Sequence, residues 1–148
     1  MTLKDELKTA LKEAIKAQNA TRKTAIRSAI AAIKLVEVDT QEELDSPTLF
    51  GILQKEVKSR QESIADAEKA DRPDLIEAAK AEMAVLKEYL PPPLTPEELE
   101  ALVKETIAEV GASSPADMGE VMKAIMPKVQ GRAEGGQVNQ LVRSQLQN

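Results

Sequence analysis

Residues 89–98 have the sequence YLPPPLTPEE, and this stretch decides how the chain is organised. Three consecutive prolines cannot continue a helix and favour a stiff, extended backbone. Thr95 and Glu98 then have the spacing of a capping box, with Pro96 at the first helical position. We therefore predict an N-terminal domain over 1–90, a proline-rich linker over 91–95 and a C-terminal domain over 96–148.

The composition predicts helices on both sides of this linker. Ala, Leu, Glu, Lys, Gln and Met dominate, and these residues lose little side-chain freedom in a helix. The two aromatic residues are Phe50 and Tyr89, and β-branched residues never form an alternating run. We predict an all-α fold, in which a bundle of long-helix hairpins precedes a compact three-helix domain.

Apolar periodicity and capping signals give approximate helix limits. In the N-terminal domain we expect helices near 2–18, 21–38, 46–70 and 74–90, with Ser46 as the N-cap of the third. In the C-terminal domain we expect helices over 96–110, from 115 to Pro127, and from about Gln137 to 146. Gly111 is predicted to end the first of these three helices.

The chain contains no cysteine and no histidine, which limits its chemistry. Serine–histidine and cysteine–histidine nucleophile systems are excluded, and so is an ordinary zinc site. Carboxylate or lysine catalysis remains possible, although no motif indicates it. We predict no catalytic residues, no metal site and no cofactor.

The N-terminal segment carries Asp5 and Glu6 where a secretory signal peptide needs an apolar stretch. No run approaches the roughly 20 apolar residues of a membrane span. We therefore expect a cytoplasmic protein with no membrane contact, although the absence of cysteine is only weak support for a reducing compartment.

Charge is distributed unevenly along the chain. Residues 1–36 hold eight basic and three acidic side chains, whereas 37–90 hold seven and fourteen, and 91–148 hold five and eight. Within the first segment, Lys4, Lys8, Lys12 and Lys16 recur every four residues. Such a stripe is either a solvated helix face or a contact for RNA or an acidic partner.

Residues 112–139, ASSPADMGEVMKAIMPKVQGRAEGGQVN, contain the most informative motif. This segment resembles the signature of the GatB/YqeY family, and YLPPPLTPEEL resembles the family's inter-domain linker. The family comprises small stand-alone helical proteins related to the C-terminal tail domain of the B subunit of the tRNA-dependent amidotransferase, a domain that contacts the body of the tRNA. Glu134 stands where the family often has Asp, a conservative departure.

The resemblance implies tRNA as partner, and the residues offer a physical route to it. Lys128 and Arg132 lie on either side of a glycine on a predicted loop able to follow phosphates, and a helix start near Gln137 directs free N–H groups at the same loop. The candidate nucleic-acid-binding residues are Lys128, Gly131, Arg132, Gly135, Gly136, Asn139 and Arg143.

Structural interpretations of the same residues stay open. Glycines at 131, 135 and 136 also suit a sharp turn between helices, and Gly119 would permit close helix packing. Methionines at 118, 122 and 126 are typical of core filler.

Three functions follow from these features. The first is a tRNA-binding accessory protein without catalysis of its own. The second is a helical adaptor that forms homo-oligomers or docks on an aminoacyl-tRNA synthetase or an amidotransferase. The third, a carbon–nitrogen ligase using glutamine as amide donor, is disfavoured because the chain has no glycine-rich phosphate loop and no nucleophile motif.

Overall fold

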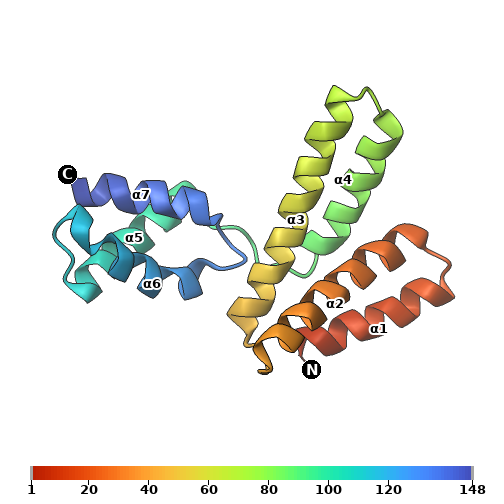
Figure 1. Cartoon of the computed structure of the whole chain (residues 1–148), viewed down its shortest axis with the longest axis horizontal. Coiled ribbons are helices and arrows are strands. Elements are labelled where there is room, and N and C mark those ends of the chain that lie inside the picture. The colour runs from red at the N-terminus through yellow and green to blue at the C-terminus, as the bar shows by residue number, and fades with distance from the viewer. Residues whose placement is uncertain (1, 148) are drawn as a thin grey trace. The chain divides into compact units, whose positions relative to one another are not determined.

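A computed structural model describes residues 2–147, which form seven α-helices and one short 3₁₀ turn, with no strand among them (Figure 1). The predicted all-α fold is confirmed. The backbone contacts divide the chain into two compact units, Met1–Leu90 (unit 1) and Pro91–Asn148 (unit 2). Each unit has a hydrophobic core of its own.

Unit 1 consists of two helical hairpins (Figure 1). The first pairs α1 (Leu3–Lys16) with α2 (Ala20–Thr40), and the second pairs α3 (Ser46–Lys69) with α4 (Pro73–Lys87). Gln18 and Asp71 adopt left-handed backbone conformations, with φ of 56° and 54°, in the two turns. These turns reverse the chain within three residues each, so consecutive helices lie side by side.

Side-chain caps fix where three of these helices begin, at Thr2, Asn19 and Asp45. The hydroxyl of Thr2 accepts a hydrogen bond from the Asp5 amide, and the Asp5 carboxylate accepts one from the Thr2 amide. The predicted N-cap Ser46 is wrong, because Asp45 occupies that position and accepts a hydrogen bond from the Thr48 amide at 2.9 Å. A carboxylate interacts more strongly than a hydroxyl with the positive end of the helix.

The core of unit 1 lies where the first hairpin meets one end of the second. Its fully buried side chains include Leu7 on α1, Ile26 on α2, Leu53 on α3 and Leu86 on α4. The remaining halves of α3 and α4 extend beyond this core (Figure 1) and bury small side chains against each other, Ala67 and Ala79.

Unit 2 contains α5 (Pro96–Val110), the 3₁₀ turn η1 (Pro115–Asp117), α6 (Met118–Val129) and α7 (Gly135–Gln147). The predicted capping box is confirmed, since the Glu98 amide donates to the Thr95 hydroxyl at 3.1 Å. Gly111 ends α5 with φ of 69°, as predicted. Fully buried valines and Ile125 form the centre of the core, and the three methionines of α6 pack partly buried around it.

Two helix limits in unit 2 differ from the prediction. Helix α6 continues past Pro127 to Val129. A proline inside a helix loses one hydrogen bond and costs about 3 kcal/mol, but this turn buries Val129 completely beside Val121 and Ile125. Helix α7 begins at Gly135, two residues before the predicted start.

Candidate functional site

The proline-rich segment is bonded to the turn that precedes α7. The Leu94 amide donates to the Arg132 carbonyl at 2.9 Å, and the Arg132 Nε donates to the Pro92 carbonyl at 2.9 Å. The Arg132 guanidinium also lies 4.0 Å from a Glu98 carboxylate oxygen. Arg132 therefore holds the proline-rich segment through both its backbone carbonyl and its side chain. The Arg132 side chain keeps 38% of its surface exposed.

Lys128 lies in the last turn of α6, not on the loop where the sequence interpretation placed it. Its ammonium group forms an ion pair with Glu109 of α5 at 2.7 Å and donates to the Thr106 hydroxyl at 3.3 Å. Thr106 is fully buried and donates in turn to the Leu102 carbonyl at 2.8 Å. Lys128 thus joins α6 to α5, and its positive charge is already balanced.

The three candidate glycines have different environments. Gly131 is buried and has φ of 81°, a left-handed conformation that side chains disfavour, so the turn itself requires it. Gly135 and Gly136 are exposed in the first turn of α7. A Cβ at Gly135 would lie 3.7 Å from the Met126 methyl group, and one at Gly136 would meet nothing within 4 Å.

Helix α7 carries the remaining candidates. Asn139 is half-buried and lies one turn after Gly135, and Arg143 lies exposed one turn further. Within residues 2–147, Arg143 forms no ion pair. The fold therefore brings Gly135, Gly136, Asn139 and Arg143 onto one helix, with Lys128 and Arg132 engaged at its base.

Gly119 does not have the environment that was expected of it. A Cβ at this position would meet no atom within 4 Å, so the interpretation that glycine permits close helix packing is wrong. The residue lies exposed in the first turn of α6, where the 3₁₀ turn separates it from α5.

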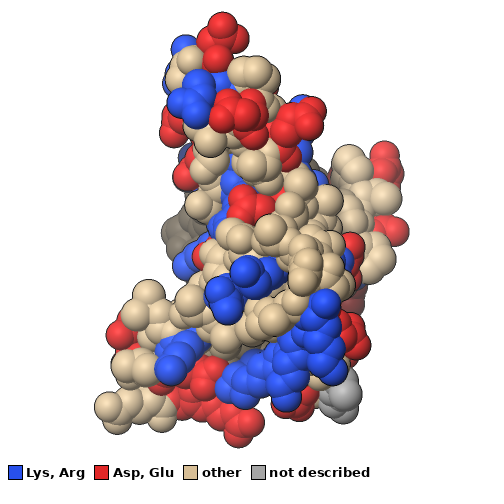
Figure 2. All heavy atoms as spheres, turned by 90° about the vertical axis from the view of Figure 1, so that its right-hand side faces the viewer, with Lys and Arg blue, Asp and Glu red and all other residues tan. Residues whose placement is uncertain are grey.

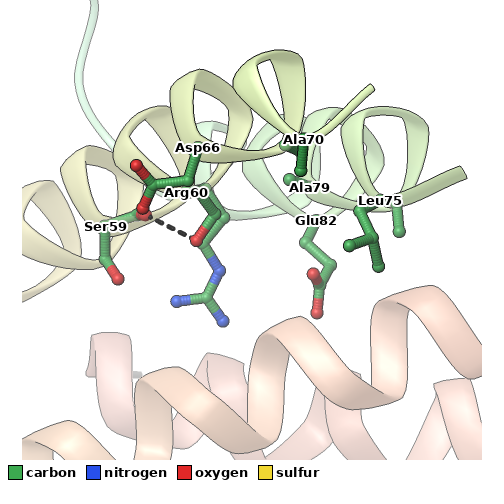
Figure 3. A pocket seen from close by; sticks show the side chains of 10 residues that line it. Ser59, Arg60, Asp66, Ala70, Leu75, Ala79 and Glu82 are labelled. Atoms are coloured by element: carbon green, nitrogen blue, oxygen red, sulfur yellow. Dashed lines mark hydrogen bonds between the residues drawn. The ribbon is translucent and has the colours of Figure 1, made fainter. Parts of the chain in front are cut away.

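Sequence reasoning missed a cleft of about 600 Å³ on the extended part of the α3–α4 hairpin. Alanines form its floor, and Arg60 and Glu82 extend from the two helices toward the same side (Figure 3). Arg60 forms an ion pair with Glu56, whose carboxylate also accepts a hydrogen bond from Ser28 at 2.8 Å. The available signal was the run of alanines at 67, 70, 78 and 79, which leaves space between the helices.

Metal-binding clusters and membrane-spanning helices are both absent from residues 2–147. In that range no group of three or more acidic side chains is arranged to hold a metal ion. None of the helices there combines the length and the apolar character that crossing a membrane requires.

Comparison with known proteins gives the family. Residues 4–146 match the model of the family described as Yqey-like protein, which covers both units and the segment that joins them. The chain belongs to the Yqey-like protein family. Its resemblance to GatB/YqeY proteins, seen first in residues 112–139, is thereby confirmed over nearly the whole chain.

Fungal relatives of the family share the same name. The chain is 34% identical over 113 residues to altered inheritance of mitochondria protein 41, mitochondrial, of Lachancea thermotolerans, a match that covers 74% of this chain and 60% of that protein. The protein of the same name from Kluyveromyces lactis is also 34% identical, over 74% of this chain and 61% of its own length. The chain thus spans about three fifths of the length of these relatives, and neither name includes an enzymatic activity.

These names contradict the predicted cytoplasmic location, because the relatives are named as mitochondrial proteins. The sequence argument rested on the lack of cysteine and of an apolar signal segment. Neither feature distinguishes the cytoplasm from the mitochondrion, since mitochondrial transit peptides are amphipathic and arginine-rich instead of strongly apolar.

Proposed function

We propose that this protein is an accessory factor that binds tRNA and performs no chemistry on it. The observation that carries the proposal is the family match over residues 4–146, because the family is related to the tail domain of the tRNA-dependent amidotransferase B subunit. That resemblance implies contact with the body of a folded tRNA. The chain has one Phe, one Tyr and no Trp, so it offers little for stacking unpaired bases, and recognition by shape and phosphate fits it better.

Within unit 2, the exposed face of α7 is the contact surface that we propose. Gly135 and Gly136 let a phosphate approach the free amides at the positive end of the helix. Arg143 supplies an uncompensated charge two turns along, and Asn139 supplies a neutral donor between them. No acidic residue occurs within α7 itself, and Glu134 is the acid that directly precedes it.

Lys128, Gly131 and Arg132 have a supporting role in this proposal. Lys128 and Arg132 hold α5 and the proline-rich segment, and Gly131 provides the left-handed turn between them. Both cations keep about a third of their side-chain surface exposed, but each already faces an acid of α5, so their part in the proposal is to position α7.

Two substitutions in the full-length protein test this surface. Arg143→Gln removes one phosphate contact, so tRNA affinity should fall about fivefold at 0.1 M salt. The slope of log K against log[salt] should become shallower by about 0.7–0.9. Gly136→Ala should not destabilise the protein, because its Cβ meets no atom within 4 Å, yet it should lower affinity by obstructing the helix N-terminus. Binding is measured by fluorescence anisotropy with labelled tRNA.

Matched controls accompany both changes. Lys104→Gln removes a cation that already pairs with Glu100 on α5, and Gly119→Ala adds a methyl group in open space on α6. Neither control should alter binding. If Arg143→Gln and Gly136→Ala bind tRNA as the controls do, α7 is not the contact surface.

We infer that the protein does not catalyse amide transfer by itself. The absence of His and Cys excludes glutaminase nucleophile systems built on these residues, and the chain has no Ser-Lys motif and no glycine-rich phosphate loop. Release of ammonia from glutamine by the purified protein, with and without ATP, would contradict this inference.

A second candidate function, a protein–protein adaptor, is favoured by an apolar strip on α2. Leu35 and Val38 are each 63% exposed, and Ala31 lies exposed one turn before Leu35. This spacing forms one continuous face that could contact a second copy, a synthetase or an amidotransferase. Leu35→Gln should abolish any association that resists both RNase and 0.5 M salt, and an unchanged association would exclude this face.

A further inference from the structure

The first hairpin, α1 and α2, carries several basic side chains that form no ion pair within the part of the chain that the structure describes. Lys8, Lys12 and Lys16 are exposed at successive turns of α1. None of them forms an ion pair with another residue of the described range 2–147. Only Lys4, the first member of the predicted stripe, is engaged there, through Glu37 of α2 at 2.8 Å. Three of the four lysines thus remain available.

Helix α2 extends this positive charge along the same edge of the hairpin. The Lys4–Glu37 ion pair places the start of α1 beside the end of α2, and Lys8 and Lys34 each lie about one turn inward from that pair. At the other end of the hairpin, Ile15 and Lys23 line one small pocket. The cations of α2 that form no ion pair with any residue from 2 to 147 are Lys23, Arg27 and Lys34.

Figure 2 shows the result on the surface. Several groups of lysine and arginine side chains lie close together on the lower part of this face, over the hairpin of α1 and α2, with acidic side chains at its lower edge. Acidic side chains are mixed with basic ones on the upper part, over α3 and α4. The excess of basic residues in 1–36, eight against three acidic ones, is thus concentrated on one part of the surface of unit 1.

We propose that this edge of the hairpin is a second RNA contact, which binds the phosphate backbone of the nucleic acid. The proposal rests on the tRNA-binding function proposed above and adds a surface in unit 1 to the one on α7. Lysines four residues apart rise about 6 Å each along a helix, so Lys8 to Lys16 span about 12 Å. A duplex presents roughly seven phosphate charges over that length, enough for every lysine of the row.

The burial of α1 favours a nucleic acid over a membrane. A helix that binds a lipid surface needs a free apolar face to insert. In α1 that face is used, because Leu7, Ala10 and Ala14 are buried against the core of unit 1. Apart from Ile15, what remains exposed on α1 is polar or charged, with the acids Asp5, Glu6 and Glu13 beside the row of Lys8, Lys12 and Lys16. The helix therefore offers no apolar face for a lipid, and attraction between the lysine row and phosphate supplies the binding energy.

The experiment compares two triple variants of the full-length protein. The first is Lys8→Gln, Lys12→Gln and Lys16→Gln on α1. The matched control is Lys58→Gln, Lys69→Gln and Lys80→Gln, which removes three exposed lysines of α3 and α4 that form no ion pair within residues 2–147. Both variants have the same net charge, and circular dichroism verifies that both remain folded.

Affinity for labelled tRNA and for a 20-base-pair RNA duplex is measured from 0.05 to 0.3 M KCl. The α1 variant should bind tRNA roughly 100-fold more weakly at 0.1 M KCl, and the slope of log K against log[KCl] should fall by about 2–3. The control should change both quantities little. Equal losses in the two variants, or none in either, would overturn the proposal.

The two probes separate this proposal from the function on which it rests. If tRNA binding depends on Arg143 but not on the α1 lysines, the proposed function stands and the second surface does not. If the α1 lysines bind the plain duplex as tightly as tRNA, the surface stands and the specific function fails. If anionic vesicles displace RNA from the wild type but not from the α1 variant, the surface is a lipid contact and the proposal is overturned.

Discussion

Unit 1 and unit 2 use their basic side chains in opposite ways. On α1 and α2 of unit 1, six of the eight cations in residues 1–36 form no ion pair within the described chain. In unit 2, Lys104, Lys128 and Arg132 all contact acids of α5, which leaves Lys123 and Arg143 of its five cations. The count of charges in a segment therefore does not indicate how much charge is free to meet a ligand.

The glycine-rich turn of unit 2 shows the same distinction. Its cations fasten α6 and the proline-rich segment, and its buried glycine serves the turn. What the turn presents to solvent is the start of α7. The composition of this turn suggests a loop that binds a ligand. In the structure, most of its residues instead connect helices, and only the start of α7 beside it is open to a ligand.

The largest effect should come from the two cores. Ile125→Ala opens a cavity in unit 2, and Leu53→Ala does so in unit 1; both side chains are fully buried, so each change should cost about 2–5 kcal/mol. Amide hydrogen exchange should accelerate in α5–α7 for the first variant and in α1–α4 for the second. Uniform acceleration along the whole chain would break the comparison, because it would mean that the cores do not act separately.

Arg132→Gln tests whether this cation is structural. The variant loses the hydrogen bond from Nε to the Pro92 carbonyl, so unit 2 should be destabilised by about 1 kcal/mol, the usual value for a partly exposed bond. Urea unfolding followed by circular dichroism measures the change. Lys123→Gln, which removes an exposed and unpaired cation of α6, is the control, and equal stability of the two variants would assign Arg132 to ligand binding instead.

Substitutions at two glycines of unit 2 should have opposite signs. Gly131→Ala forces a side chain into φ of 81° and should cost about 1 kcal/mol. Gly119→Ala lies in a helix with nothing within 4 Å of the new Cβ, so it should stabilise unit 2 by a few tenths of a kcal/mol. Thermal unfolding of both variants decides this, and a stabilising effect of Gly131→Ala would show that the turn does not need glycine.

The smallest effect concerns acid stability in unit 1. Hydrogen bonds from Thr48 hold the pKa of Asp45 below its usual value of 3.8, and those from Thr2 do the same for Asp5. A lowered pKa in the folded state stabilises fully above the unfolded pKa, and this contribution is lost as the pH falls through the folded pKa. The melting temperature of the wild type should therefore drop below about pH 4.

Asp45→Asn keeps a good N-cap but removes its titration. The variant should lose less of its melting temperature than the wild type between pH 5 and pH 2, as followed by circular dichroism. Identical pH profiles would mean that this cap contributes no acid sensitivity to unit 1.

Much of the secondary structure was predictable because its signals are local. Thr95, Pro96 and Glu98 specify a helix start among themselves, and Gly111 specifies a helix end through its own φ. The limit at Pro127 failed because the burial of Val129, a tertiary effect, outweighs a local penalty. The cap at Asp45 was missed because adjacent Asp and Ser both carry suitable side chains, and the sequence does not tell which one accepts the bond.

The sequence by itself determined the all-α class and the family, since composition, periodicity and a long gapless motif are properties of the chain alone. It also located the basic stripe, because a four-residue spacing fixes one helix face. Only the tertiary structure decided which cations are free, because Lys4, Lys128 and Arg132 interact with acids or carbonyls on other elements. The partner of Lys4 lies 33 residues away in the sequence, and the carbonyl that Arg132 binds lies 40 residues away. Such pairings depend on how helices pack, and a charge pattern read along one chain does not contain them.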